Sequence, residues 1–272
     1  MLSLFLLIIS ISAGFLGALL GLGGGIIVVP VLTLGFGIDI RYAIAASLIS
    51  IIATSSGAAA SFLKDHLTNV RLAVLLELGT VGGAITGFLI SSNINSSSLY
   101  ILFGGFLLFS AVMMFRKKGD ARSEVDHPWS QKLKLASSYP NEKGELVFYK
   151  VAQVPLGLFS MYVAGIFSAL LGIGSGIFKV MAMDGAMKLP MKVSSATSNF
   201  MIGVTASASA GAYLLRGDIR VEIASPVALG IIIGSWIGAR AMTRMRPEII
   251  RKIFVIVLVI VSVQMIMRGF KA

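Results

Sequence analysis

The chain repeats itself at a fixed offset of 151 residues. Residues 13–26 (AGFLGALLGLGGGI) return as residues 164–177 (AGIFSALLGIGSGI), and further matches follow at that offset through both halves. Two apolar halves that each carry a glycine-broken hydrophobic segment at the same place are typical of secondary transporters, in which the substrate site lies between the repeats. The repeat therefore predicts two transmembrane units, residues 1–115 and 151–272, joined by a polar linker at 116–150.

Composition places the chain in a lipid bilayer. Of its 272 residues, 56% are hydrophobic and 13% are charged, and the mean hydropathy is +0.91, which leaves too little polar surface to cover a soluble globule. We expect an all-α polytopic membrane protein built from two repeats of four segments each. Most of the eight charge-poor stretches are near the ~20 residues that cross hydrocarbon as a helix; they are residues 2–38, 42–63, 72–92, 98–115, 151–187, 193–215, 223–239 and 253–267.

The first segment of each half is too long for one crossing and too short for two. Residues 2–38 and 151–187 are interrupted in the middle by glycines, at 21–25 and 172–176. Glycine lowers helix stability by roughly 1 kcal/mol per residue and permits close backbone approach. The pattern predicts a broken, re-entrant hairpin with an unwound tip in each half.

The charges of the loops predict the topology. Residues 91–98 carry no charge, whereas their repeat partner at 240–252 holds five basic residues against Glu248. Because basic loops face the cytoplasm, the two equivalent loops are expected on opposite sides. This makes the halves an inverted repeat, with the linker in the cytoplasm and both termini outside. This topology puts Arg216 and Arg220 outside, which the preference of basic loops for the cytoplasm disfavours.

Several classes of function are excluded by the motifs that the sequence lacks. It has no H-E-x-x-H, G-x-S-x-G or G-x-x-x-x-G-K-[ST] pattern and no cysteine, so we expect neither an enzyme nor a resident metal or cofactor. The net charge of +11 comes from 23 basic residues scattered over the loops, which favours a membrane topology signal over nucleic-acid binding. In the linker, alternation at 132–138 and 144–151 indicates either a small β-hairpin or a plain solvated segment.

The glycine tips have two interpretations. Free backbone N–H groups at the start of the half-helix after each tip would bind an anion, with the helix dipole adding to the attraction. Glycines also allow helices to pack closely, which is the simpler explanation for Gly83-x-x-x-Gly87 and Gly230-x-x-x-Gly234. The candidate anion-binding positions at the tips are Gly23, Gly24, Gly25, Gly174, Ser175 and Gly176.

Hydroxyl side chains follow each tip on a helix that otherwise crosses lipid. Many such hydroxyls bond only to the carbonyl four residues earlier. Asn199 is harder to explain in this way, because an amide in hydrocarbon needs several partners, and we expect it to face the ligand. The polar positions of this stripe include Ser47, Ser50, Thr54, Ser55, Ser56, Ser194, Ser195, Thr197, Ser198, Asn199, Thr205, Ser207 and Ser209.

Three ionisable residues lie within the apolar segments. Lys179 comes three residues after Gly176 and has no counter-ion nearby in the sequence. Asp184 is about 140° round an ideal helix from Lys179 and pairs more naturally with Lys188. Two alternatives for Lys179 stay open: it binds an anionic substrate, or it snorkels or pairs across helices with Glu77. Glu77 is expected near the membrane interface, and Glu77 or Asp184 would be the titrating group of a proton-coupled carrier.

The sequence resembles the TauE/SafE family of membrane transporters. The resemblance rests on the run Gly21–Pro30 (GLGGGIIVVP), on Ala45-Ala46-Ser47 and on its echo Ala196-Thr197-Ser198, and it covers the chain outside residues 116–150. It implies an exporter of small sulfur-containing anions, such as sulfite or sulfonates, in the inner or plasma membrane. The positions that match the family pattern are Gly21, Gly23, Gly24, Gly25, Pro30, Ser47, Gly172, Gly174, Gly176, Thr197 and Ser198.

The chain departs from the family pattern at three positions. Ser175 replaces a glycine, Met181 stands where the motif has proline, and Lys179 adds a cation among residues that are usually apolar. Ser175 and Lys179 keep the site suited to anions. An alternating-access carrier is the function that the sequence favours; an anion channel with the same lining, or a membrane scaffold that docks a soluble partner through the linker, remain as alternatives.

Overall fold

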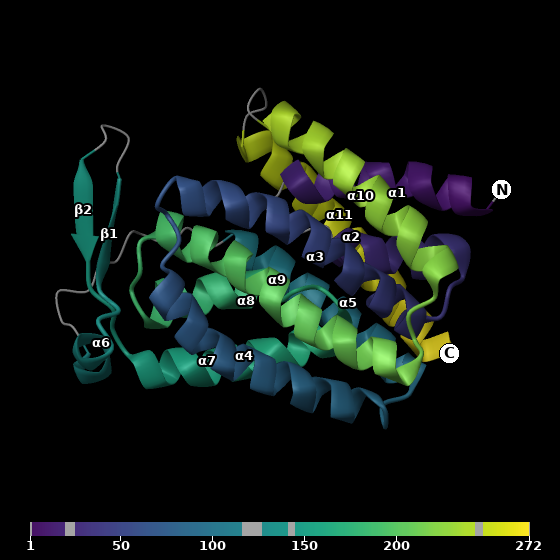
Figure 1. The fold of residues 1–272 in the computed structure, drawn as a ribbon. Helices are drawn as coiled ribbons and strands as arrows, with labels where there is room; N and C mark the ends of the chain where they lie inside the picture. The colour runs from purple at the N-terminus through teal and green to yellow at the C-terminus, as the bar shows by residue number, and fades with distance from the viewer. Residues whose placement is uncertain (1, 20–24, 116–126, 141–144, 243–246, 272) are drawn as a thin grey trace.

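The computed structural model describes residues 2–19, 25–115, 127–140, 145–242 and 247–271. Eight long helices in this part of the chain lie side by side in one bundle (Figure 1). They are α1 (Leu2–Leu19), α3 (Ile40–Lys64), α4 (Val70–Ser91), α5 (Ser96–Phe115), α7 (Val154–Leu171), α9 (Met191–Arg216), α10 (Val221–Met242) and α11 (Pro247–Lys271).

Four of these helices, α3, α4, α5 and α7, are long and apolar enough to cross a membrane over the described residues. Shorter apolar helical stretches occur at Leu4–Phe15, Gly25–Gly35 and Val221–Ile237. The prediction of an all-α membrane protein is confirmed.

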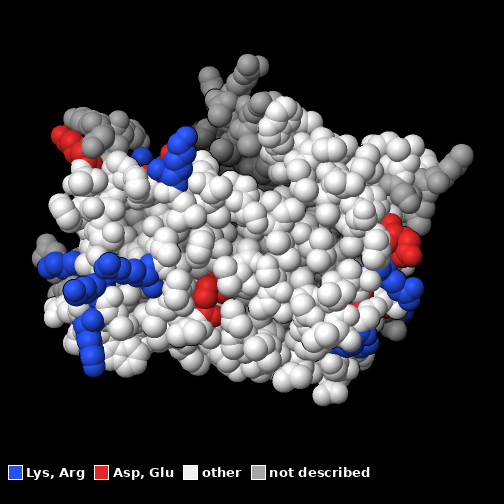
Figure 2. All heavy atoms as spheres, viewed as in Figure 1, with Lys and Arg blue, Asp and Glu red and all other residues white. Residues whose placement is uncertain are grey.

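The bundle has two distinct ends. The N- and C-termini lie together at one end, which we call the termini end, and the linker lies at the other, which we call the linker end (Figure 1). Lysine and arginine side chains gather near both ends, and the middle of the face in Figure 2 is almost free of charge apart from one acidic group. An uncharged belt between two charged ends is what a bilayer requires.

The helices of the two halves begin and end at matching positions. α2 (Gly25–Pro30) and the π-helical segment η1 (Val31–Gly35) lie 151 residues before α8 (Gly176–Met181) and η2 (Ala182–Ala186). α4 and α10 differ by the same offset at both ends, and the other pairs agree to within a few residues. The similarity of the halves thus extends from residue types to helix boundaries.

Glycines bring two pairs of helices into backbone contact. A Cβ atom at Gly83 of α4 would lie 2.0 Å from the carbonyl oxygen of Tyr162 in α7, and one at Gly234 of α10 would lie 2.0 Å from that of Ile11 in α1. These two contacts are themselves 151 residues apart on both partners. Small residues let helices approach closely in lipid, where packing replaces the hydrophobic effect as the driving force.

The pairing of α5 with α11 is antiparallel. Gly104 of α5 lies against Ser262 and Ile266, whereas Gly269 of α11 lies against Ser97 and Ile101. The Ser262 hydroxyl donates to the Gly104 carbonyl at 2.7 Å. These two helices occupy corresponding positions in the two halves, and they run in opposite directions.

The described part of the linker, residues 127–140 and 145–150, folds against the bundle. It contains α6 (Pro128–Lys132) and the antiparallel strands β1 (Ser137–Pro140) and β2 (Leu146–Tyr149), with Ser138 opposite Phe148. β2 lies within the alternating range 144–151, whereas β1 overlaps only the end of the range 132–138 and continues to Pro140. The linker is not a free tether, because its buried side chains form one apolar cluster with the end of the second hairpin, made by Leu135, Tyr139, Tyr149, Val151, Met183, Met187 and Leu189.

Asn69 joins this linker to the helices. Its side-chain amide donates to the Leu135 carbonyl at 2.8 Å and to the Tyr149 hydroxyl at 2.9 Å, and its Oδ1 accepts the backbone N–H of Leu72 at the start of α4. Burial raises the pKa of the Tyr149 phenol, so the hydroxyl stays protonated at neutral pH. Asn69 thereby fixes the linker end of α4.

Replacing Gly83 by alanine should lower the melting temperature of the purified protein, because the added Cβ would overlap the Tyr162 carbonyl and overpacking costs about 1–3 kcal/mol. Gly105→Ala in α5 is the matched control, since no heavy atom lies within 4 Å of its Cβ position and alanine favours the helix by roughly 1 kcal/mol. Equal decreases in melting temperature for Gly83→Ala and Gly105→Ala would contradict the close packing of α4 against α7.

Candidate functional site

The helical segment is broken at the second glycine run, where the glycines predict. α7 ends at Leu171 and α8 begins at Gly176. Between them Gly172 and Gly174 have φ values of +63° and +68°, and Ser175 has +48°. These left-handed conformations favour glycine, so the serine at 175 is held there at a cost in backbone strain. We call residues 172–175 the second tip.

Side chains from neighbouring helices bond to carbonyls around the second tip. The Ser47 hydroxyl of α3 donates to the Gly172 carbonyl at 2.6 Å, and the Ser198 hydroxyl of α9 donates to that of Gly176 at 3.2 Å. The Tyr213 hydroxyl donates to the Ala169 carbonyl at 2.9 Å, in the last turn of α7. The carbonyls at the end of α7 have no partners within that helix, and Ser47 and Tyr213 supply donors to two of them.

Of the first tip, Gly21, Gly23 and Gly24 lie outside the described residues. Gly25, the first residue of α2, is described, and it meets the second tip. A Cβ atom there would lie 2.8 Å from the Ser47 hydroxyl oxygen and 2.9 Å from the Gly172 carbonyl oxygen. The start of α2 and the second tip are therefore in contact at Ser47.

The Ser175 hydroxyl is buried and unpaired. The residue is 1% exposed, and in the described part of the chain its Oγ has no hydrogen-bond partner. A buried hydroxyl without a partner costs about 1–3 kcal/mol. Since the residue also holds a strained conformation, Ser175 points to a function that packing does not explain.

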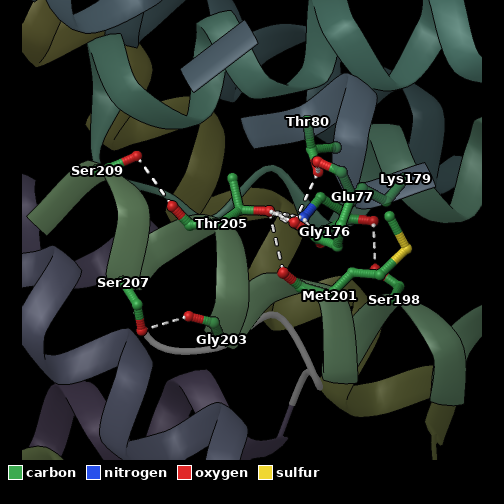
Figure 3. Close-up of polar contacts among 10 residues, drawn as sticks. All are labelled: Glu77, Thr80, Gly176, Lys179, Ser198, Met201, Gly203, Thr205, Ser207 and Ser209. Carbon is green, nitrogen blue, oxygen red and sulfur yellow. Dashed lines mark hydrogen bonds and ion pairs between the residues drawn. The ribbon is translucent and has the colours of Figure 1, made fainter. Parts of the chain in front are cut away.

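A buried ion pair lies one helical turn beyond the second tip (Figure 3). The Lys179 ammonium of α8 is 3.4 Å from Glu77 Oε1 of α4 and 2.5 Å from the Thr205 hydroxyl of α9. Lys179 is fully buried and Glu77 is 7% exposed. Of the two alternatives open for Lys179, the structure has the pair with Glu77, and Glu77 is not an exposed interfacial side chain.

Two threonines complete the surroundings of the Glu77 carboxylate. Thr80 donates to Oε2 at 2.8 Å, and the Thr205 oxygen lies 3.1 Å from Oε1 and 3.0 Å from Oε2. The ion pair thus links three helices, because Glu77 and Thr80 come from α4, Lys179 from α8 and Thr205 from α9. Burying two charges is tolerated only when hydrogen bonds of this kind satisfy them.

The ion pair, which joins the first half to the second, has no equivalent at the repeat-related positions. The residues 151 positions away from Lys179 and Glu77 are Val28 and Ala228, and only Thr205 has a polar counterpart, Thr54. The hydroxyl of Thr54 bonds to carbonyls of its own helix. The charged group therefore departs from the match between the two halves.

Three of the predicted site residues have other surroundings than the hydrogen bonds described above for the second tip and the ion pair. The Thr197 hydroxyl accepts the backbone N–H of Asn69 at 3.1 Å and so belongs to the network that fixes the linker end. Asn199 Nδ2 donates to the Ser195 carbonyl of its own helix at 3.0 Å, which differs from the expectation that its own turn supplies no sufficient partner. Asp184 is buried in η2.

Reasoning from the sequence did not single out Thr80 or Tyr213. Thr80 lies three residues after Glu77 on the same helix face, which is a usable signal. Tyr213 is a lone tyrosine near the end of an apolar helix, and nothing in the sequence indicates its distant partner. Within the described ranges no three His, Cys, Asp or Glu side chains are grouped so as to hold a metal ion.

Comparison with known proteins gives one family. The family model described as "Sulfite exporter TauE/SafE" matches residues 6–265. "Probable membrane transporter protein YunE" of Bacillus subtilis is 28% identical over 97% of both chains. "Probable membrane transporter protein MJ0441" of Methanocaldococcus jannaschii is 27% identical over 90% of this chain and 88% of its own. No solved structure matches the chain.

Breaking the ion pair from one side should destabilise the protein more than removing both partners. Lys179→Met leaves the Glu77 carboxylate buried without its cation, and such losses amount to about 3–5 kcal/mol. The double variant Lys179→Met, Glu77→Gln should lose clearly less than the sum of the two single variants in thermal unfolding of the purified protein. If the stability losses of the two single variants add up to that of the double variant, Lys179 and Glu77 do not depend on each other.

Proposed function

The chain belongs to the TauE/SafE family of transmembrane transporters, and from this premise we propose that it is a secondary carrier which exports small sulfur-containing anions such as sulfite or sulfonates. The substrate would bind in the middle of the bundle, between the two halves. The family description names sulfite, and the polar groups at the second tip suit a small oxyanion.

The observation that carries this proposal is the buried, unpaired hydroxyl of Ser175. It lies beside the start of α8, where the first N–H groups of a helix have no partner within the helix. A hydroxyl donor next to free amides and close to a buried lysine favours a negatively charged ligand over a neutral or positive one. The proposed binding residues are Gly23, Gly24, Gly25, Ser47, Gly174, Ser175, Gly176, Lys179 and Ser198, of which Ser175 has the strongest support; Thr197 and Asn199 bond to other partners and are left out.

Ser47 and Ser198 act in this proposal by holding the tip open. Their hydroxyls bond to the carbonyls of Gly172 and Gly176, so the carbonyl dipoles point toward α3 and α9. The amides of the same peptide groups then face the other way. An anion would therefore meet N–H groups and would not be repelled by carbonyl oxygens.

We infer that the two halves are inverted repeats with re-entrant first segments. The support is that α5 and α11, which correspond to each other at the repeat offset, pack antiparallel. A two-fold axis that exchanges two antiparallel helices is perpendicular to them. For helices that cross the membrane, such an axis lies in the membrane plane. Alternating access would follow from movement of one half against the other around the tips.

The same topology gives the orientation in the cell membrane. The linker and the two termini lie at opposite ends of the bundle (Figure 1). We place the linker end in the cytoplasm, because the sequence of loops 116–150 and 240–252 is rich in lysine and arginine. The termini end would then face outward.

Proteoliposomes loaded with unlabelled sulfite should accumulate radiolabelled sulfite by counterflow, which a channel does not do. Ser175→Ala should lower this exchange about tenfold, the loss expected for one hydrogen bond to a charged group, and Lys179→Met should abolish it. Ser130→Ala is the matched control, because Ser130 is also buried and unpaired but lies in α6. Absence of counterflow with sulfite, thiosulfate and sulfoacetate would refute the proposed function.

Coupling to protons would use Glu77, since protonation of its carboxylate frees the Lys179 ammonium for the anion. Glu77→Gln should therefore remove the dependence of net flux on an imposed pH gradient while exchange of labelled for unlabelled anion persists. Asp184→Asn, which changes the other candidate carboxylate, buried in η2, should keep the gradient dependence. Gradient-driven flux that survives in Glu77→Gln would assign coupling to another group.

A further inference from the structure

Arg216 sits at the termini end between two aromatic rings. It is the last residue of α9, and its guanidinium carbon lies 4.6 Å from the ring centre of Phe88 in α4 and 4.7 Å from that of Tyr213. The two rings meet edge to face, with centroids 5.2 Å apart. Cation–π contacts with two rings restrict the position of a guanidinium and leave its N–H groups for hydrogen bonds.

The edges of this guanidinium are only partly used. Nε forms an ion pair with Asp218. Nη1 donates to the hydroxyls of Ser91 at 2.9 Å and Ser92 at 3.0 Å. Nη2 is buried and, among the residues that the structure describes, has no hydrogen-bond partner. An unpaired N–H of a charged group is costly, so this edge lacks an acceptor.

The missing acceptor has a recognisable chemistry. Both N–H groups of Nη1 are used by the hydroxyls of Ser91 and Ser92, so the pair that can hold two oxygens of one anion is Nε with Nη2, once the Asp218 carboxylate leaves Nε. The side chains of Arg216 and Asp218 are 23% and 15% exposed, so an anion that displaces Asp218 would reach this edge from solvent. Planar bidentate donors suit a small oxyanion such as a sulfonate, sulfate or phosphate group.

A single side chain connects this place to the second tip. The Tyr213 ring covers the guanidinium, and its hydroxyl bonds to the Ala169 carbonyl, three residues before Gly172. Movement of the ring would therefore break a bond in the last turn of α7. The residues 151 positions away from Arg216, Tyr213 and Phe88 are Asp65, Phe62 and Ala239, so the sequence provides no such arrangement at the linker end.

We propose that Arg216, with Ser91 and Ser92, forms a second oxyanion site at the termini end, in which a bound anion replaces the Asp218 carboxylate. The class of anion rests on the proposed function, but the site is separate from the second tip. An anion that leaves the tip would be held by Arg216 before it reaches solvent. This role explains an arginine on the side where the charge rule disfavours one.

The chain contains no cysteine, so a single reporter thiol can test the site. Asn93→Cys places it next to Ser92 on an exposed position. The rate of alkylation of the purified full-length protein would be measured at constant ionic strength with sulfoacetate, sulfate or phosphate. We expect at least one of these anions to slow the labelling in a saturable way. The half-protecting concentration is the anion concentration that halves the labelling rate, and Arg216→Gln should raise it about tenfold or more.

Two further variants separate binding from a structural role. Asp218→Asn removes the competing carboxylate and should lower the half-protecting concentration severalfold. Arg220→Gln removes the neighbouring arginine, which stacks on Tyr42, and should leave it unchanged. If none of the three anions protects the thiol, if Arg216→Gln is protected like its parent, or if Asp218→Asn weakens protection, the site does not exist.

This assay does not depend on transport. Counterflow that requires Ser175 but occurs without thiol protection would refute only the second site. Thiol protection that requires Arg216, in a protein without counterflow, would refute only the proposed carrier function.

Discussion

The structure depends on one constraint, that backbone groups at a helix break inside a membrane must find partners within the protein. The second tip shows how this chain meets it. Ser47, Ser198 and Tyr213, from α3 and α9, donate to the carbonyls around the break. These two helices thereby restrict the conformation of residues 172–175; in the proposed function the tip amides and the Ser175 hydroxyl would be left for a ligand. The glycine contacts of α4 with α7 hold those two helices close together.

The charged group adds an asymmetry to two matched halves. Lys179, Glu77 and Thr205 connect α8, α4 and α9, whereas the positions equivalent to Lys179 and Glu77 are Val28 and Ala228. An ion pair in a low-dielectric interior is strongly coupled to any anion or proton that arrives beside it. Substrate binding would therefore act on one hairpin more than on the other, and Arg216 extends the same asymmetry to the termini end.

Much of the fold could be predicted from the sequence, because the repeat offset and the glycines are local features. The break after Leu171 and the helical character of the chain follow from residue types alone. The site was less accessible. The pairing of Lys179 with Glu77 spans 102 residues and depends on how α8 rotates against α4, which no spacing rule supplies. Asn199 shows the same difficulty, since its amide donates to a carbonyl of its own helix turn although its chemistry favoured a ligand. Chemistry-bearing residues could be selected from the sequence, but not the directions in which they point.

The central claim is that an oxyanion binds at the second tip through the Ser175 hydroxyl. A crystal structure with bound selenite, whose selenium can be located by anomalous scattering, tests it directly. The account predicts a selenium peak at residues 172–176, with an oxygen of the anion about 2.5–3.0 Å from Ser175 Oγ. A selenite that binds elsewhere in the bundle, while the Ser175 hydroxyl remains unpaired, would contradict the account.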